Sequence, residues 1–308
     1  MNKPKVIVIC GPTASGKTAL SIELAKKING EIVSADSMQI YKKMNIGSAK
    51  PTIEEMQGIA HYCIDFVEPN QRYSVANFKY DAKKAIKEII NKNKNPIVVG
   101  GTGLYINSLI DEIEYTDIKI DEKYRQYLEK IVQNEGLNKL YDMAKKIDPQ
   151  AMEKICSNDK KRILRVLEIY HDTGKTKTEQ EIESRKKEVE YNYKVFAINM
   201  DREILYNRIN TRVDKMIEQG LIQEVKGILD EYTDFPTAMQ ALGYKEVKQY
   251  LDSELTKQEM IEKIKQESRR YAKRQITWFK RNKQTIWLDG TQDIKENINI
   301  ILAESEED

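Results

Sequence analysis

Residues 10–18, Cys-Gly-Pro-Thr-Ala-Ser-Gly-Lys-Thr, have the spacing of a phosphate-binding loop. Glycines let the chain curl so that backbone N–H groups converge on an anion, and the N-terminus of the following helix adds partial positive charge. The Lys17 ammonium supplies a full charge, and the Thr18 hydroxyl is suited to ligate Mg²⁺. The predicted phosphate site comprises Gly11, Pro12, Thr13, Ala14, Ser15, Gly16, Lys17 and Thr18. The loop alone does not identify the molecule that carries the phosphate.

A second stretch with polar residues, 34–41, lies at the carboxyl end of the next predicted strand. Open parallel sheets place their ligands at the carboxyl ends of their strands, so Asp36 could accept a proton or a hydrogen bond there. The amide of Gln39 could read the edge of a purine. In the alternative interpretation, Asp36 and Ser37 cap a following helix. Spacing alone leaves both interpretations open.

The acidic residue that usually ends a strand near a hydrolysed nucleotide is missing from its expected position. The apolar run 96–99 ends in Gly100 and Gly101, and the nearest acid is Asp36. Small-molecule kinases of the shikimate type share that arrangement. The phosphate loop therefore leaves open a kinase, which would bind ATP, or another enzyme that grips a diphosphate.

The elements that must position these residues alternate between strand and helix. Strands are predicted at 5–10, 31–36 and from 95 into a glycine turn, and helices at 18–28, at 75–92 and after that turn. Such alternation with short connections predicts an α/β fold with a doubly wound parallel sheet.

The alternation stops between residues 117 and 190, where only helix-like segments occur, and resumes with strands at 193–200 and 284–290. An all-helical block between two halves of a sheet indicates an inserted domain. The predicted organisation is a first core segment at 1–116, a helical insertion at 117–192 and a second core segment at 193–308.

Composition restricts the class of protein further. The formal net charge is only +2, so a nucleic-acid partner must be met by a local basic patch. Cys10, Cys63 and Cys156 are scattered without metal-ligand spacing, which predicts reduced, buried thiols. No signal peptide or membrane-length apolar run is present, so we expect a soluble cytoplasmic protein.

Six motifs occur in the order seen in the tRNA dimethylallyltransferases, also called tRNA isopentenyltransferases. They are GPTASGKT, ADSMQIY, GGTGLY, RVDKMIEQGLIQEV, QALGYKE and AKRQITWF, and the resemblance extends from Lys5 to about Gly290. It implies a P-loop NTPase-like core that transfers a dimethylallyl group from dimethylallyl diphosphate to N6 of adenine 37. The usual substrates of that family are tRNAs that read codons beginning with uridine.

The resemblance also implies the catalytic residues. Asp36 matches the general base that draws the proton from N6, and Thr102 matches a threonine where the adenine meets the isoprenoid. The charge that grows on the leaving diphosphate would be neutralised by Lys17, by Mg²⁺ on Thr18 and by an arginine. We favour Arg212 for that arginine, with Arg208 second; the alternative is that both form surface salt bridges with Asp214 and Glu218.

The resemblance places tRNA contacts in both core and insertion. The segment 269–283 contains seven basic residues and no acid, as expected of a helix face that meets phosphates. Where the family commonly has Gln-Arg, this chain has Lys161-Arg162, which puts base-specific contact at that position in question. The predicted tRNA-binding residues are Asp36, Ser37, Met38, Gln39, Thr102, Arg125, Lys161, Arg162, Arg165, Arg270, Lys273 and Arg274. We expect a monomer bound to the anticodon stem-loop.

Three other functions are compatible with the phosphate loop. The first is an ATP-dependent kinase of a small metabolite, and the second is an adenylate isopentenyltransferase that prenylates free adenine nucleotides. Neither needs a helical insertion or a basic helix. The third is a P-loop protein that binds RNA without catalysis, which does not call for a reactive set such as Asp36, Thr18 and Thr102.

Overall fold

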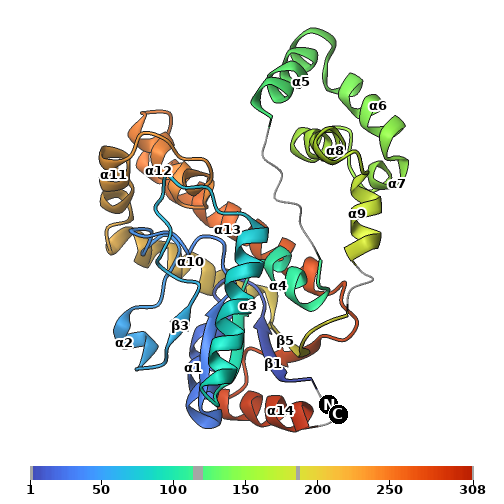
Figure 1. The fold of residues 1–308 in the computed structure, drawn as a ribbon. Coiled ribbons are helices and arrows are strands. Elements are labelled where there is room, and N and C mark those ends of the chain that lie inside the picture. The colour runs from blue at the N-terminus through green and yellow to red at the C-terminus, as the bar shows by residue number, and fades with distance from the viewer. Residues whose placement is uncertain (1–2, 114–120, 185–187, 307–308) are drawn as a thin grey trace. The chain divides into compact units, whose positions relative to one another are not determined.

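The computed structural model describes residues 3–113, 121–184 and 188–306 (Figure 1). The chain forms two compact units, residues 1–110 with 190–308, and residues 111–189. The predicted domain boundary at residue 117 lies outside the described residues, and the assignment of the insertion to tRNA binding stays a prediction.

In the described part of the first unit, six parallel strands form one sheet in the order β3-β2-β4-β1-β5-β6. The strands are β1 Lys5–Cys10, β2 Gly30–Ser34, β3 His61–Tyr62, β4 Asn95–Gly100, β5 Asn192–Asn199 and β6 Ile286–Asp289. Because β1 lies between β4 and β5, the phosphate loop that follows it emerges at the middle of the carboxyl edge. The predicted doubly wound α/β fold is confirmed. The two-residue β3 was not predicted, because it has no apolar run.

Helices cover both faces of this sheet (Figure 1). The described helices of this unit are α1 Lys17–Ile28, α2 Ile53–Met56, α3 Val75–Asn91, α4 Gly103–Ile110, α10 Arg202–Glu218, α11 Leu221–Glu231, α12 Tyr244–Leu251, α13 Lys257–Phe279 and α14 Ile294–Glu306, with a 3₁₀ turn at Ala238–Gln240. Side-chain caps mark several starts. Ser74 accepts the N–H of Asn77 at α3, and Thr256 accepts the N–H of Glu259 at α13.

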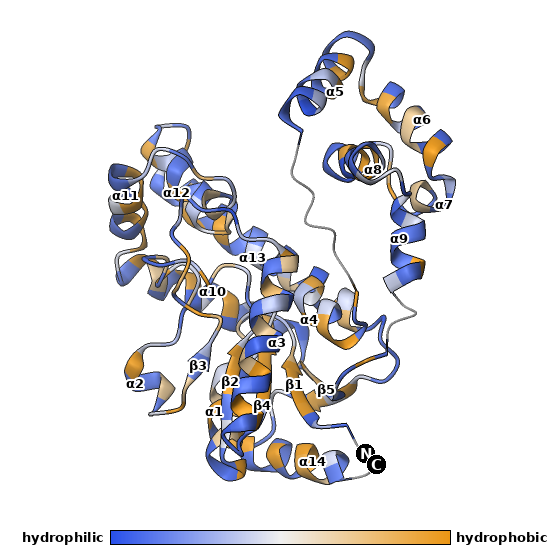
Figure 2. Ribbon diagram, in the orientation of Figure 1, coloured by the Kyte–Doolittle hydropathy of each residue, from blue (hydrophilic) through white to orange (hydrophobic). Residues whose placement is uncertain are grey.

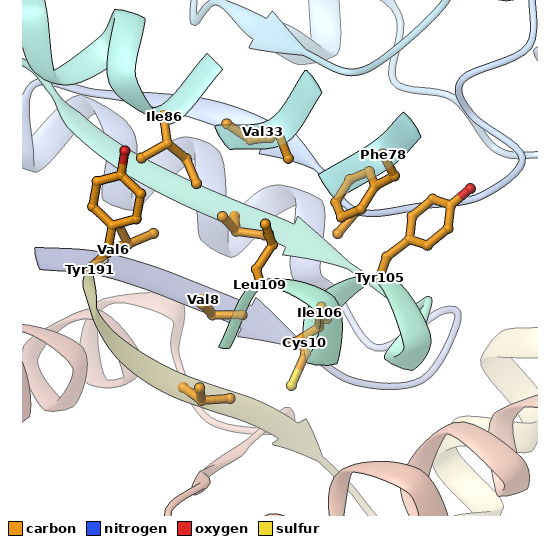
Figure 3. Close-up of a cluster of buried hydrophobic side chains, with 14 of the residues drawn as sticks. Val6, Val8, Cys10, Val33, Phe78, Ile86, Tyr105, Ile106, Leu109 and Tyr191 are labelled. Atoms are coloured by element: carbon orange, nitrogen blue, oxygen red, sulfur yellow. The ribbon is translucent and has the colours of Figure 1, made fainter. Parts of the chain in front are cut away.

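Alternation along the strands separates two cores. Val6, Val8 and Cys10 of β1 face α3 and α4, whereas Ile7 and Ile9 face α1, α10 and α14. Figure 3 shows Val8 and Cys10 on the side of the sheet where Ile106 of α4 packs. Strands β1, β2 and β4 are buried along nearly their whole length, and Figure 2 colours most of their length as hydrophobic, which is typical of a parallel sheet covered by helices.

A third core joins the segment after β2 to α10–α13. Tyr41, Met44 and Tyr244 are fully buried there. The carboxylate of Glu224 accepts the backbone N–H groups of residues 45, 46 and 47 at 2.9, 2.8 and 3.1 Å, and also the Tyr244 hydroxyl at 2.6 Å. These contacts hold the 38–50 segment against the helices, so that it forms a wall at the carboxyl edge of the sheet.

The second unit is helical throughout its described part. Its helices are α5 Glu122–Glu135, α6 Leu137–Ile147, α7 Pro149–Met152, α8 Lys160–Thr173 and α9 Lys177–Ser184. Leu128, Leu140, Ile163 and Leu167 belong to a core of its own. The buried Asp148 caps α7 and accepts the hydroxyl and the N–H of Thr178 at the start of α9, which ties the last helix to that core.

Some details differ from the sequence predictions. Strand β2 ends at Ser34, so Asp36 lies in a turn rather than in the strand. Cys10 is buried and Cys63 is half-buried, but Cys156 is exposed, so the prediction of three buried thiols is wrong there. In the described ranges no helix is long and apolar enough to span a bilayer.

Candidate functional site

The phosphate loop connects β1 to α1 with backbone geometry that glycine permits. Gly11 and Gly16 have φ values of 140° and 92°, in the region that side chains disfavour. A Cβ atom on Gly11 would also lie 2.9 Å from the Ile198 carbonyl oxygen of β5. The Ser15 hydroxyl in this loop is buried and has no hydrogen-bond partner among the described residues. The loop thus presents backbone and side-chain donors suited to an anion at the first turn of α1.

Two cations face each other at this loop. The Lys17 ammonium folds back over the loop and donates to the Pro12 carbonyl oxygen at 2.6 Å. The Arg212 guanidinium, from α10, donates to the Thr13 hydroxyl at 3.3 Å. Burial, the largest cause, and the charge of Arg212 together lower the pKa of Lys17 from 10.5 to about 8, against the opposing effect of Asp36. A concentrated positive charge of this kind favours a multiply charged anion.

Asp36 faces the cation pair from the turn after β2. Its charge opposes the downward pKa shifts of both Lys17 and Arg212, which identifies it as the nearby carboxylate. Oδ1 of Asp36 accepts the N–H groups of Met38 and Gln39 at 2.8 and 3.3 Å, while Oδ2 makes no hydrogen bond among the described residues. Asp36 therefore stabilises a turn with one oxygen and leaves the other for a ligand. No helix follows this turn directly.

Thr102, in the turn between β4 and α4, lies beside the Asp36 turn. Its hydroxyl oxygen accepts the Ser37 N–H at 3.0 Å, and its own N–H donates to the Ala35 carbonyl oxygen at 3.2 Å. Strands β2 and β4 are neighbours in the sheet, so their carboxyl ends bring these two turns together. Thr102 is hydrogen-bonded to Ser37 rather than lining the cavity itself.

The amide of Gln39 is used inside the protein. Its Nε2 group donates to the carbonyl oxygens of Ser48 and Ala49 at 3.3 and 3.1 Å, and its Oε1 accepts the Ser34 hydroxyl at 3.3 Å. These bonds hold the 47–50 segment in place. The reading of a purine edge by Gln39 stays a prediction, and it requires these bonds to be exchanged.

One cavity of about 360 Å³ lies within the first unit, and it is lined by residues of the phosphate loop, of the turn that carries Asp36 and of α10. Thr13, Lys17, Thr18 and Arg212 form its phosphate-loop end, and Asp36 lies on its wall. Apolar side chains cover another part of its surface, namely Ile209, Val213, Met216, Leu242 and Ile264. A cavity with a cationic end, a carboxylate and an apolar surface suits a ligand that carries both a phosphate group and a hydrocarbon.

The two candidate arginines differ in position. Arg208 is exposed, makes a long 3.5 Å contact with the Gly290 carbonyl oxygen and does not line the cavity. Arg212 lines the cavity and forms no ion pair among the described residues, while Asp214 pairs with Lys265 at 2.7 Å. The alternative of a surface salt bridge from Arg212 to Asp214 is therefore not seen.

Helix α13 carries the predicted basic face. Arg270, Lys273 and Arg274 are exposed, and Arg274 also reaches the cavity. Arg270 pairs with Glu267 at 2.6 Å, a partner just outside the acid-free segment. Sequence reasoning missed Tyr271 and Gln275 of the same helix, which line the cavity. Their helical spacing was visible, but the turn that they contact lies far away in the chain.

The candidate residues of the second unit are already paired. Arg125 contacts Glu168 at 3.7 Å, and Arg162 contacts Asp159 at 3.3 Å. Lys161 and Arg165 also have interaction partners. They lie on α5 and α8 of that unit.

The fold and site define a P-loop α/β protein in which an anion-binding loop and a carboxylate share one cavity. A family model described as IPP transferase matches residues 39–282. The tRNA dimethylallyltransferase of Carboxydothermus hydrogenoformans is 50% identical over 294 residues, covering 96% of this chain and 94% of that protein. That of Acetivibrio thermocellus is 50% identical over 304 residues, covering 97% of each. The chain belongs to the IPP transferase family.

Solved structures agree with this assignment. The tRNA isopentenylpyrophosphate transferase of Bacillus halodurans is 43% identical, with a TM-score of 0.74 and coverage of 99% of this chain and 98% of that one. A eukaryotic dimethylallyltransferase, captured acting on tRNA, is 33% identical, with a TM-score of 0.80 and coverage of 94% and 74%. The resemblance to the family stated from the motifs is confirmed.

Proposed function

We propose that this protein transfers a dimethylallyl group from dimethylallyl diphosphate to N6 of adenine 37 in tRNAs reading codons that begin with uridine. The observation that carries the proposal is the single cavity lined by the cationic loop residues, by Asp36 and by apolar side chains. Relatives at 50% identity with the name tRNA dimethylallyltransferase support the choice of reaction.

The diphosphate is proposed to lie at the loop. Lys17, Arg212 and the loop N–H groups offset the charge that appears on the leaving diphosphate as its bond to carbon breaks. The Thr18 hydroxyl lines the same cavity and is proposed to hold Mg²⁺. Among the described residues, no group of three or more His, Cys, Asp or Glu side chains could hold a metal ion. Bound Mg²⁺ would supply further charge stabilisation.

Binding of dimethylallyl diphosphate is expected to take up a proton above about pH 8. The free protein loses the Lys17 proton near that pH, whereas the bound anion favours the ammonium form, so affinity falls by up to about tenfold per pH unit. Calorimetry in buffers of different ionisation enthalpy, between about pH 7 and about pH 9.5, measures the uptake. Lys17→Met should bind more weakly and take up no proton at this site. Equal uptake in that variant would assign the proton to another group.

The nucleophile is proposed to be the exocyclic amine of the flipped adenine. Its lone pair is spread into the ring, so removal of a proton during attack helps the reaction. As the N6–C1 bond forms and the C1–O bond to diphosphate breaks, Oδ2 of Asp36 takes the N6 proton. Thr102 and Ser37, which are hydrogen-bonded to each other, support the turn beside that carboxylate.

Extruding the base costs a few kcal/mol, which contacts elsewhere on the RNA must offset. We propose that the exposed face of α13, with Arg270, Lys273 and Arg274, meets tRNA phosphates. Arg125, Lys161, Arg162 and Arg165 of the second unit are proposed to contact the anticodon stem-loop.

Changing Arg270, Lys273 and Arg274 to glutamine should weaken tRNA binding and flatten its salt dependence. Each lost phosphate contact reduces the slope of log K against log salt by about 0.7 to 0.9. Arg270 should contribute least, because Glu267 already pairs with it. Filter binding over a range of salt concentrations measures the slope.

The matched control changes Lys26, Lys27 and Lys92 to glutamine. They are exposed at the C-terminal ends of α1 and α3, at the sheet edge opposite the phosphate loop. This triple variant should retain the wild-type slope. An equal loss in both triple variants would show a general charge effect rather than a binding face.

The reaction is tested with purified protein, Mg²⁺, unmodified tRNA and dimethylallyl diphosphate, followed by mass spectrometry of the digested tRNA. A dimethylallyl adduct at adenine 37 supports the proposal. An adduct formed on free AMP but not on tRNA would identify an adenylate isopentenyltransferase instead. ATP consumption with small metabolites and without prenyl transfer would identify a kinase. We also propose that the protein is a monomer in the cytoplasm. Light scattering of the pure protein tests its oligomeric state.

A further inference from the structure

Gln275 connects two separate parts of the site through one buried amide. Its Oε1 accepts the backbone N–H of Thr13 in the phosphate loop at 2.9 Å. Its Nε2 donates to the backbone carbonyl oxygen of Gly101, in the turn before α4, at 2.9 Å. The side chain is only 5% exposed. An amide is suited to this bridge because one end accepts and the other donates.

The bridge belongs to a longer contact between α13 and the β4–α4 turn. Tyr271, Gln275 and Trp278 are four and three residues apart, so they lie on one helical face. Tyr271 lines the cavity, and the Trp278 indole N–H donates to Oδ1 of Asn107 in α4 at 2.7 Å. Two side chains of one helix, Gln275 and Trp278, therefore bond to the β4–α4 turn and to α4, which lie 174 and 171 residues earlier.

Side chains of α13 approach closely the two glycines at the β4–α4 turn, Gly101 and Gly103. A Cβ atom on Gly101 would lie 2.2 Å from Nε2 of Gln275, and one on Gly103 would lie 2.3 Å from Cδ1 of Trp278. Side chains of α13 thus fill the space beside these two glycines. The close approach lets the Gln275 amide reach both backbone segments.

Each bonded segment serves a different substrate in the proposed function, on which this inference rests. Thr13 belongs to the diphosphate loop, and its hydroxyl also accepts a hydrogen bond from Arg212. Gly101 precedes Thr102, beside the turn that carries Asp36. Displacement at carbon requires the leaving group, the carbon and the nucleophile to be aligned, and an error of about 1 Å costs about 100-fold in rate.

We propose that Gln275 is a positioning residue that holds the phosphate loop and the Gly101–Thr102 turn in register, so that the diphosphate and the adenine are aligned for transfer. Gln275 touches neither reacting atom in this role. Its loss should act on the chemical step more than on substrate binding.

The test compares Gln275→Leu and Gln275→Glu in steady-state dimethylallyl transfer to tRNA. The leucine side chain makes neither hydrogen bond. An ionised glutamate places a negative oxygen beside the Gly101 carbonyl oxygen, so the two acceptors repel each other. We expect kcat to fall about 100-fold in both at neutral pH, with KM for either substrate changed less than about tenfold. Gln266→Leu, an exposed glutamine of the same helix, is the matched control and should behave as wild type.

Lowering the pH separates positioning from a structural role. A protonated glutamic acid accepts with its carbonyl oxygen and donates with its O–H, as the amide does. The ratio of Gln275→Glu kcat to wild-type kcat should therefore rise as the pH falls, whereas the ratio for Gln275→Leu should stay flat. Loss of kcat with this rescue supports the proposal.

Three results from kinetics and stability would overturn it: near wild-type kcat in Gln275→Leu, absence of rescue in a Gln275→Glu protein with wild-type thermal stability, or a loss explained by the unfolded fraction measured by circular dichroism. Failure of the proposed function is separate, because the wild-type protein would then form no adduct. In that case, calorimetry still measures the affinity of the phosphate loop for dimethylallyl diphosphate. A drop of more than about 100-fold in that affinity in Gln275→Leu would make Gln275 a binding residue and reject the positioning role.

Discussion

Asp36→Asn is expected to reduce dimethylallyl transfer by about 10² to 10⁴, the usual contribution of a general base. Oδ1 of Asp36 supports the turn by accepting the Met38 and Gln39 N–H groups, and asparagine keeps an oxygen that accepts them. The substitution therefore removes the base but preserves the turn. Binding of tRNA should stay close to wild type. Single-turnover rates with saturating enzyme, together with tRNA affinity, measure the two effects.

Asp252→Asn is the matched control, because Asp252 is exposed and pairs with Lys248 on the surface of α12. It should leave both quantities unchanged. Asp36→Ala removes the turn-supporting oxygen as well, so it should lose some stability in addition to activity. A parallel loss of tRNA binding and transfer in Asp36→Asn would assign Asp36 a structural role in its turn, and full activity would exclude Asp36 as the base.

The second large effect separates the two arginines of α10. Arg212→Gln should reduce kcat/KM by about 10² to 10³, because a cation beside the leaving diphosphate is removed. Arg208→Gln should have little effect, since Arg208 is exposed and lies outside the cavity lining. The two variants control for each other, because they remove the same charge from one helix, one turn apart.

Steady-state kinetics with dimethylallyl diphosphate varied at saturating tRNA measures both variants. Arg212→Lys retains the charge but not the planar donor set, so its activity should fall between wild type and Arg212→Gln. Equal losses in Arg208→Gln and Arg212→Gln would assign the effect to net charge. A loss confined to Arg208→Gln would reverse the assignment made here.

The parts of the site that could be predicted from sequence are local. The phosphate loop is contiguous, and its glycines, its lysine and the following helix determine its shape through backbone geometry. Asp36 was predicted as a candidate because it follows a strand, and the structure places it on the cavity wall. Its two possible uses could not be separated, because the same carboxylate both supports the turn and has an oxygen available.

The hydrogen bonds that a side chain makes in the folded protein could not be predicted from the sequence. Gln39 resembled a purine reader, but its amide bonds to the backbone of the 48–49 segment. Gln275 was overlooked inside a basic segment, because nothing local shows that its neighbours in space are Thr13 and Gly101. The segment 269–283 contains no acid, so its sequence showed no sign of an ion pair within it. In the structure, Arg270 pairs with Glu267, which lies one turn earlier on the same helix.

The sequence by itself determined the α/β class, the phosphate loop and the family, because hydrophobic alternation and short ordered motifs are local properties of the chain. Only the tertiary structure decided that Arg212 rather than Arg208 lines the cavity, and that α13 holds the β4–α4 turn. Those outcomes depend on the order of parallel strands and on how helices pack against their carboxyl ends. Contacts between segments so far apart in the chain are set by packing, which local spacing does not encode.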